Sequence, residues 1–468
     1  MTQRPTHDDP VVASLSEVVG GPAGDHARPH RWWTPVRVLL ALFTVVFALG
    51  LVQKYPCGET NWSDTDVRYG KMCYSDIPYL YTGRGFAEHR WPYAADDGRY
   101  QVMEYPVGIS YLAWGVSELV RPLATGPSYE IRSHAEPAAL WGLPGMAGEV
   151  NRYFLLSALV LFLCGLGAVF FLAGASPGRP WDAAAFAVSP VLLVSALVNW
   201  DLLAVLCTAG ALWAWVRRRP ALAGVMVGLG AAAKLYPVFL LGAFLVDVLW
   251  SAVSAHRGGR PGPRSLRPLG VSAVGAASAW LLVNLPALVT GPQEWKVFWT
   301  FNSDRGADLG SLWLVLDQHG LHASPGAINA VSLVAFALAC LAILALGVSA
   351  PARPRVAQIG FLVVAAFLLV NKVYSPQYVL WLLPLAVLAR PRWRDLLIWQ
   401  GGELLYFGAV WLYLGGWLDP ASGNVPLAYH LAILLRVAAE LYLVVLVARD
   451  VRSGSPQVID TRSNAVAV

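Results

Sequence analysis

The sequence predicts an all-α integral membrane protein, built as a bundle of about 12 transmembrane helices. Of its 468 residues, 56% are hydrophobic and only 13% are charged, whereas about 25% of the residues of a soluble domain are charged. The mean hydropathy of +0.52 agrees with this interpretation. Apolar runs long enough to cross a bilayer recur along the chain, so one membrane domain replaces the roughly three soluble domains that this length would otherwise suggest.

The candidate spans follow one another from the first apolar run to the last. They cover about residues 36–52, 152–174, 181–199, 201–216, 221–234, 236–250, 269–290, 326–349, 357–372, 376–390, 395–415 and 426–448. Several are short and are interrupted by Pro190, Pro237 or Pro376. Irregular backbone at membrane depth is tolerated where it is buried in protein or lines a cavity.

The positions of arginines decide whether a further apolar segment, EYPVGISYLAWGVSELV at 104–120, crosses the membrane. Arginines cluster in five connections between spans: at Arg179; at Arg217, Arg218 and Arg219; at Arg257, Arg260, Arg264 and Arg267; at Arg353 and Arg355; and at Arg390, Arg392 and Arg394. Arginines favour the cytoplasmic side. All five clusters lie there only if 104–120 does not cross, so we expect an interfacial helix in the first outer loop. These arginines report topology and give no sign of a nucleic-acid partner.

This topology divides the chain into three parts. Residues 1–35 are polar and are expected to form a disordered cytoplasmic tail instead of a cleavable signal peptide. The membrane domain covers 36–448, with a first extracytoplasmic loop at 53–151, and a second cytoplasmic tail covers 449–468. The turns NWD, KLYP and NKVYSPQY are then expected on the outer face.

Two of the five cysteines, Cys57 and Cys73, share the first outer loop. An oxidising compartment permits a disulfide that closes a loop of about 15 residues and contributes about 3 kcal/mol in the chain-entropy model. The sequence leaves open whether they are bonded. No spacing of Cys and His is typical of a zinc site, and no glycine-rich loop is typical of phosphate binding.

Polar residues expected at the outer face form the candidate site. They are Asp76, Glu104, Asn199, Asp201, Lys234, Tyr236, Arg305, Lys372, Tyr374 and Gln377. Ionisable groups near a span are costly and are functional candidates by default. The structural alternatives are that Lys234 and Lys372 extend to the interface and that Asp201 caps the following helix. Lysine is normally a cytoplasmic marker, so two outer lysines with Arg305 favour a site for an anionic phosphate.

Several motifs carry a resemblance to a known family. The early Asp of a long first outer loop, EYP, SP…NWDLLAV, AGVMVGLGAAAKLYP and NKVYSPQYVLWLLP resemble the GT-C class of membrane glycosyltransferases, and within it glycosyltransferase family 87. The similarity extends over about 36–448. Family members, actinobacterial mannosyltransferases among them, use polyprenyl-phosphate sugars at the outer face of the plasma membrane. The resemblance implies a GT-C-like bundle and an inverting hexosyltransferase in a bacterial plasma membrane, with mannose as the expected sugar and a glycolipid or glycan acceptor.

The resemblance also implies roles for residues of this chain. Asp76 corresponds to the usual candidate for the general base, and its neighbours Tyr74, Tyr79 and Tyr81 would line a sugar site or exclude water from it. Arg305, Lys372 and Lys234 would neutralise the donor phosphate, and Gln377 and Tyr374 would hydrogen-bond to it or to the sugar. Glu104, Asp201 and Tyr236 complete the substrate-binding set.

No cofactor is expected, because no second acidic residue stands beside Asp76 as a DxD pair. A divalent metal stays an open alternative if Glu104 or Asp201 meets Asp76 in space. The alternative function is a transporter or flippase, since broken spans with buried charge also describe carriers. Against it, the sequence shows no repeat relating its halves, and the candidate residues gather at one face instead of at the membrane midplane.

Overall fold

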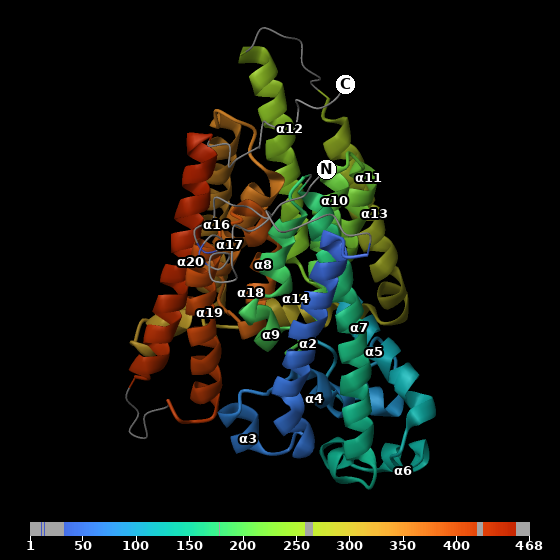
Figure 1. Cartoon of the computed structure of the whole chain (residues 1–468). Helices are drawn as coiled ribbons and strands as arrows, with labels where there is room; N and C mark the ends of the chain where they lie inside the picture. Colours follow the sequence, from blue (N-terminus) through green and yellow to red (C-terminus); the bar gives the residue numbers. More distant parts are fainter. Residues whose placement is uncertain are drawn as a thin grey trace.

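A computed structural model describes residues 32–176, 178–257, 265–418 and 425–454, together with Val11 and Ser14. Within these ranges every regular element is a helix. Long helices run side by side, and small helices of the first outer loop gather at one end of the bundle (Figure 1). The start of the first long helix and the end of the last lie toward the opposite end. Most of the predicted tails, 1–35 and 449–468, lies outside the described ranges.

Among the described residues, six helices are long and apolar enough to span a membrane. They are α2 (Pro35–Glu59), α7 (Met146–Ala175), α12 (Leu240–Arg257), α13 (Arg267–Thr290), α16 (Pro325–Ser349) and α20 (Leu427–Ser453). The chain is therefore a multi-pass membrane protein. A short 3₁₀ helix, η5 (Tyr236–Phe239), leads directly into α12.

The other predicted spans coincide with shorter or interrupted helices. They are α10 (Leu202–Val216), α11 (Pro220–Ala233), α17 (Val356–Val370), α18 (Val379–Ala389) with its leading turn η6 (Pro376–Tyr378), and α19 (Trp393–Leu414). The predicted span 181–199 is divided into η4 (Pro180–Ala183), α8 (Ala184–Ala187) and α9 (Pro190–Ser195). Proline has no amide hydrogen and cannot continue a helix from its N-terminal side, so Pro190 starts a new helix after Ser189. The exact number of membrane crossings stays a prediction.

Small residues bring α11 and α13 into backbone contact. A Cβ atom on Gly224 would collide with the carbonyl oxygen of Ser272, and one on Gly228 would collide with that of Ala276. Glycines four residues apart lie on one face of a helix and let a neighbouring backbone approach closely, which is how many membrane helices pack. This contact fixes α11, whose end carries Lys234.

The first outer loop folds into several short helices. They are α3 (Thr65–Gly70), α4 (Asp76–Gly83), η1 (Phe86–Glu88), α5 (Val107–Val120), η2 (Arg121–Leu123), α6 (Tyr129–His134) and η3 (Pro137–Gly142). The segment predicted to be interfacial forms α5, which packs against α7, α11 and α13. Its position relative to the bilayer stays a prediction. Two further helices, α14 (Pro292–Asp304) and α15 (Leu312–Gln318), connect α13 to α16.

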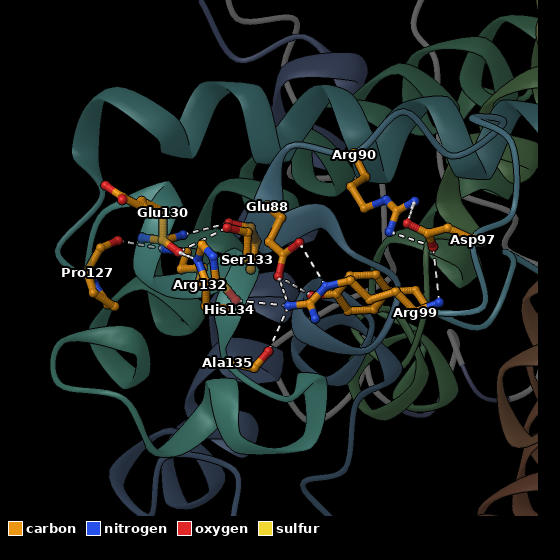
Figure 2. Close-up of polar contacts among 12 residues, drawn as sticks. Glu88, Arg90, Asp97, Arg99, Pro127, Glu130, Arg132, Ser133, His134 and Ala135 are labelled. Carbon is orange, nitrogen blue, oxygen red and sulfur yellow. Dashed lines mark hydrogen bonds and ion pairs between the residues drawn. The ribbon is translucent and has the colours of Figure 1, made fainter.

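Charged hydrogen bonds hold this outer loop together. Arg99 Nη2 donates to Glu88 Oε1 at 2.6 Å and to two backbone carbonyls, and Arg132 Nε donates to the Pro127 carbonyl at 2.8 Å (Figure 2). The Arg132 guanidinium also forms a bidentate pair with Glu149 at 2.6 and 2.8 Å, which ties α6 to the first turn of α7. Because Arg132 and Glu149 are both buried, each depends on the other for neutralisation.

A disulfide joins Cys57, at the end of α2, to Cys73, with the two Cα atoms 5.8 Å apart. Cys73 stands three residues before Asp76. The segment that leads into α4 is therefore attached covalently to the first long helix.

Replacing Arg132 by Met should lower the thermal midpoint of the purified protein strongly. Removing one partner of a buried ion pair leaves an unpaired buried charge, at a cost of about 3–5 kcal/mol. The matched control is Arg121→Met, because Arg121 is 66% exposed and lies 3.6 Å from Glu118, an arrangement worth at most about 1 kcal/mol. Equal midpoints for the two variants, measured by thermal denaturation in detergent, would contradict the assignment of Arg132 as a structural anchor.

Candidate active site

Asp76 is the first residue of α4, and three side chains hold its carboxylate. The Tyr74 hydroxyl donates to Oδ1 at 2.8 Å, while Asn199 Nδ2 and the Tyr105 hydroxyl donate to Oδ2 at 2.7 and 3.3 Å. The Asp76 amide also donates to the Val198 carbonyl at 2.8 Å. The NWD turn after α9 and the start of α4 are thus fixed to each other, which orients the carboxylate.

The local sequence explains why α4 begins here. Ser75 adopts an extended backbone and its hydroxyl accepts a hydrogen bond from the Ile77 amide at 3.3 Å, which is the usual form of an N-cap. Asp76 follows in the first turn, where a helix favours negative charge. Burial nevertheless raises the pKa of Asp76, and the hydrogen bonds from Tyr74 and Asn199 together with the charge of Lys234 only partly oppose this. Asp76 as a residue is partly exposed, so it lies at the edge of the buried core and not inside it.

A buried ion pair lies beside this carboxylate. Lys234 Nζ lies 3.5 Å from Asp201 Oδ1, which also accepts a 2.6 Å hydrogen bond from the Trp381 indole. The Lys234 ammonium lies 4.9 Å from the centre of the Tyr105 ring. Both Asp201 and Lys234 are buried, so Lys234 does not extend to an interface. The alternative that Asp201 caps the next helix is wrong, since its side chain makes no such hydrogen bond.

The Glu104 carboxylate pairs with Arg84, whereas the metal alternative requires it to meet Asp76. Its two oxygens accept hydrogen bonds from Arg84 at 2.8 and 3.0 Å. The next residue, Tyr105, is the one that contacts Asp76. Glu104 and Asp201, the two carboxylates invoked for a metal, therefore each face a cationic side chain. In the described part of the chain, no group of three His, Cys, Asp or Glu residues has the arrangement of a metal site.

Arg305 and Lys372 lie together in a second cluster after α14. Arg305 Nε donates to Asp308 at 2.6 Å, and the Asp308 amide donates to the Lys372 carbonyl at 2.8 Å. Lys372 Nζ donates to Asn329 at 2.6 Å and to the Ser303 carbonyl at 3.3 Å. Burial and the charge of Arg305 lower the pKa of Lys372. The Arg305 side chain is 28% exposed, so it is the more accessible cation of the two.

Three predicted residues are buried away from Asp76. The Tyr236 hydroxyl accepts from Thr208 at 3.0 Å, while its ring stacks 4.9 Å from Trp381. The Tyr374 hydroxyl donates to Glu403 at 2.9 Å. The Gln377 side chain is buried.

The tyrosines beside Asp76 differ in the direction of their hydroxyl groups. Of Tyr74, Tyr79 and Tyr81, Tyr74 is the one whose hydroxyl donates to Asp76. The Tyr79 hydroxyl donates to the Trp62 carbonyl at 2.6 Å, and the Tyr81 hydroxyl donates to Glu149 at 2.5 Å. A short helix points successive side chains in different directions, so the hydroxyls of Tyr79 and Tyr81 bond elsewhere. That the three tyrosines line a sugar site stays a prediction.

Sequence reasoning missed two groups of residues. Tyr105 and Trp381 bind the two central carboxylates, yet an aromatic residue in an apolar run carries no distinctive signal. Arg436 was missed as well: its guanidinium donates to Glu440 at 2.9 Å and lies 3.7 Å from the centre of the Tyr374 ring. Charged residues inside the last two predicted spans could have identified this cluster, since such residues are rare within membranes and usually have a partner.

Comparison with known families supports the resemblance. The model of glycosyltransferase family 87 matches residues 140–371, just under half of the 468 residues. The matched region includes Asn199, Asp201, Lys234 and Arg305, while Asp76 precedes it. A search of curated proteins gave no match. The match suggests a membrane glycosyltransferase, an enzyme class whose substrates are lipids and glycans.

Lys234→Met should destabilise the protein by about 3–5 kcal/mol, because Asp201 would remain buried without its cation. The double variant Asp201→Asn/Lys234→Met should recover much of this loss, since an asparagine oxygen can still accept the Trp381 hydrogen bond. Thermal midpoints of both variants test the coupling. Lys71→Met is the control, because Lys71 is exposed and its loss should have little effect. A double variant no more stable than Lys234→Met would refute the pairing.

Proposed function

We propose that this protein transfers a hexose, with mannose expected, from a polyprenyl-phosphate donor to an extracytoplasmic glycolipid or glycan, and that Asp76 is the general base. The observation that carries the proposal is a carboxylate held by three side-chain donors in a chain that matches the model of glycosyltransferase family 87. A carboxylate fixed in this way can accept a proton from a substrate hydroxyl without first reorganising.

The reaction is a single displacement at the anomeric carbon. The acceptor hydroxyl oxygen forms a bond to that carbon as the bond from the carbon to the phosphate oxygen breaks. The electron pair of the broken bond leaves with polyprenyl phosphate, and the hydroxyl proton goes to Asp76. Attack from the side opposite the leaving group inverts the anomeric configuration.

A single carboxylate suffices for this chemistry. Phosphate is a good leaving group, so no acid has to protonate it, in contrast to the two carboxyl groups that glycoside hydrolysis requires. The raised pKa of Asp76 strengthens it as a base, because base strength follows pKa as long as the group is ionised at the working pH.

The donor phosphate requires positive charge. Arg305 is accessible and carries a planar set of donors suited to phosphate oxygens. Lys372 supports Arg305 indirectly. The Lys372 carbonyl accepts a hydrogen bond from the Asp308 amide, and the Lys372 ammonium donates to the Ser303 carbonyl, so both ends of the segment that carries Arg305 are bound to Lys372. Lys234 is paired with Asp201 and acts on the electrostatics of Asp76 instead of binding phosphate. The sequence alone predicts a phosphate role for Arg305, Lys372 and Lys234, and we keep Arg305 as the direct ligand.

The transporter alternative has less support. The family match favours an enzyme, and the Asp201–Lys234 pair is internally neutralised, as a structural element would be. We further propose that the active site lies on the outer face of a bacterial plasma membrane with both termini in the cytoplasm, which the arginine distribution supports.

Replacing Asp76 by Asn should lower transfer by about 10²–10⁴-fold, the usual contribution of a general base, while donor binding is retained. The measurement is transfer from radiolabelled polyprenyl-phosphate mannose in membranes without background activity. Asp66→Asn, an exposed carboxylate of the same loop, is the matched control and should leave transfer unchanged. Equal transfer by Asp76→Asn and wild type would remove Asp76 from the mechanism.

The pH profile provides an independent test. Transfer needs ionised Asp76, so activity should fall as the pH decreases through its raised pKa. Tyr74→Phe removes a hydrogen bond that lowers this pKa, so the acid limb of kcat/KM should move to higher pH. Tyr79→Phe is the control, because the Tyr79 hydroxyl bonds to a backbone carbonyl. An acid limb that stays in place in Tyr74→Phe, or that moves equally in both variants, would show that another group titrates.

A further inference from the structure

An open pocket lies beside Asp76, with Tyr105 as part of its wall. It encloses about 380 Å³ of empty space, including the part open to solvent. The residues of interest in its wall come from α13, α14 and the segment before α5: Trp280, Asn284, Glu294, Trp295, Trp299 and Tyr105. This pocket is not part of the Asp76 cluster described above, but it shares Tyr105 with that cluster.

Close packing gives the pocket a fixed shape. Gly108, in the first turn of α5, lies against the end of α11, where an added Cβ would be 2.9 Å from the Ala232 carbonyl oxygen. The Trp295 indole donates to Asn284 Oδ1 at 2.8 Å, which connects α14 to α13. The Trp295 ring lies 6.5 Å from that of Trp280 and 6.0 Å from that of Trp299. The three indoles are therefore neighbours in the wall, with successive rings inclined at 72° and 56°.

The charge of the wall indicates what the pocket can bind. Its lining contains Glu294 and no Lys, Arg or His. Glu294 is buried, and its Oε1 accepts a hydrogen bond from the Asp96 amide at 2.9 Å. A phosphate would be repelled there. Aromatic faces together with a carboxylate and an amide suit a neutral saccharide, whose C–H faces pack on rings and whose hydroxyls donate to oxygen.

The position of the pocket indicates which substrate this saccharide belongs to. Tyr105 lines the pocket and its hydroxyl donates to Asp76 at 3.3 Å, so one side chain connects a sugar bound there to the base. Arg305 of the cationic cluster stands directly after α14, six residues beyond Trp299 and therefore about 9 Å farther along the helix axis. An acceptor must be close to the base, whereas the donor phosphate must be close to the cations.

We propose that this pocket is the acceptor site and binds a neutral saccharide, with the three tryptophans as its platform. The inference rests on the proposed function and specifies its acceptor class. The saccharide can be the headgroup of a glycolipid or the end of a soluble glycan.

The test measures saccharide binding in the absence of donor. Protein in lipid nanodiscs, which avoid glycoside detergents, is titrated with octyl α-mannoside and with mannotriose by saturation-transfer NMR. Trp299→Ala should weaken binding about tenfold or more, because it removes an indole that is 40% exposed. Trp299→Phe, which keeps a ring, should restore most of the affinity. The matched control Trp417→Ala removes an indole that is 51% exposed and lies outside the pocket, and it should bind like wild type.

The outcomes separate this inference from the proposed function. Saturable binding that depends on Trp299 and not on Trp417 supports the acceptor site, and a preference for octyl α-mannoside over mannotriose identifies a lipid-linked acceptor. No saturable binding to wild type, or equal binding to wild type and Trp299→Ala, overturns the inference. Because the assay contains no donor and no transfer step, it can succeed even if Asp76→Asn proves fully active, and it can fail while the transferase function stands.

Discussion

The fold of the active site depends on one connection, the hydrogen bonds between the NWD turn and the start of α4. The Val198 carbonyl accepts from the Asp76 amide, and the Asn199 amide donates to the Asp76 carboxylate. The first contact sets the position of the helix and the second sets the orientation of the side chain. Without this connection, the Asp76 carboxylate would not be held beside the buried pair of Asp201 and Lys234.

The carboxylates around the candidate site differ in what holds them. Asp201 meets Lys234 and Glu149 meets Arg132, whereas Asp76 is held mainly by neutral donors. A buried carboxylate that faces a cation is stabilised in its ionised form and becomes a poor base, whereas one surrounded by hydroxyl and amide groups remains able to take a proton. The contrast between Asp76 and Asp201 therefore assigns different tasks to two aspartates that the sequence alone presents as similar.

Much of the architecture could be predicted, because apolar runs and prolines determine where membrane helices begin and end. Observed helix bounds such as α16 (Pro325–Ser349) and α13 (Arg267–Thr290) lie within a few residues of the predicted spans. The grouping of Asn199, Asp201 and Lys234 was also predictable, since each stands at a turn between consecutive spans. The partners of Glu104 and Tyr374 were not predictable. Arg84 and Glu403 reach them by tertiary packing, and no spacing along the chain encodes which of two neighbouring polar groups a side chain will select.

The disulfide between Cys57 and Cys73 has a consequence for the timing of maturation. Thiols stay reduced in the cytosol, so with the loop on the proposed outer face this bond forms only after the loop has crossed the membrane. The bond fastens the segment three residues before Asp76 to the end of α2. The final alignment of the active site would then be linked to export itself, and nascent chains still on the cytoplasmic side would lack the fully constrained site.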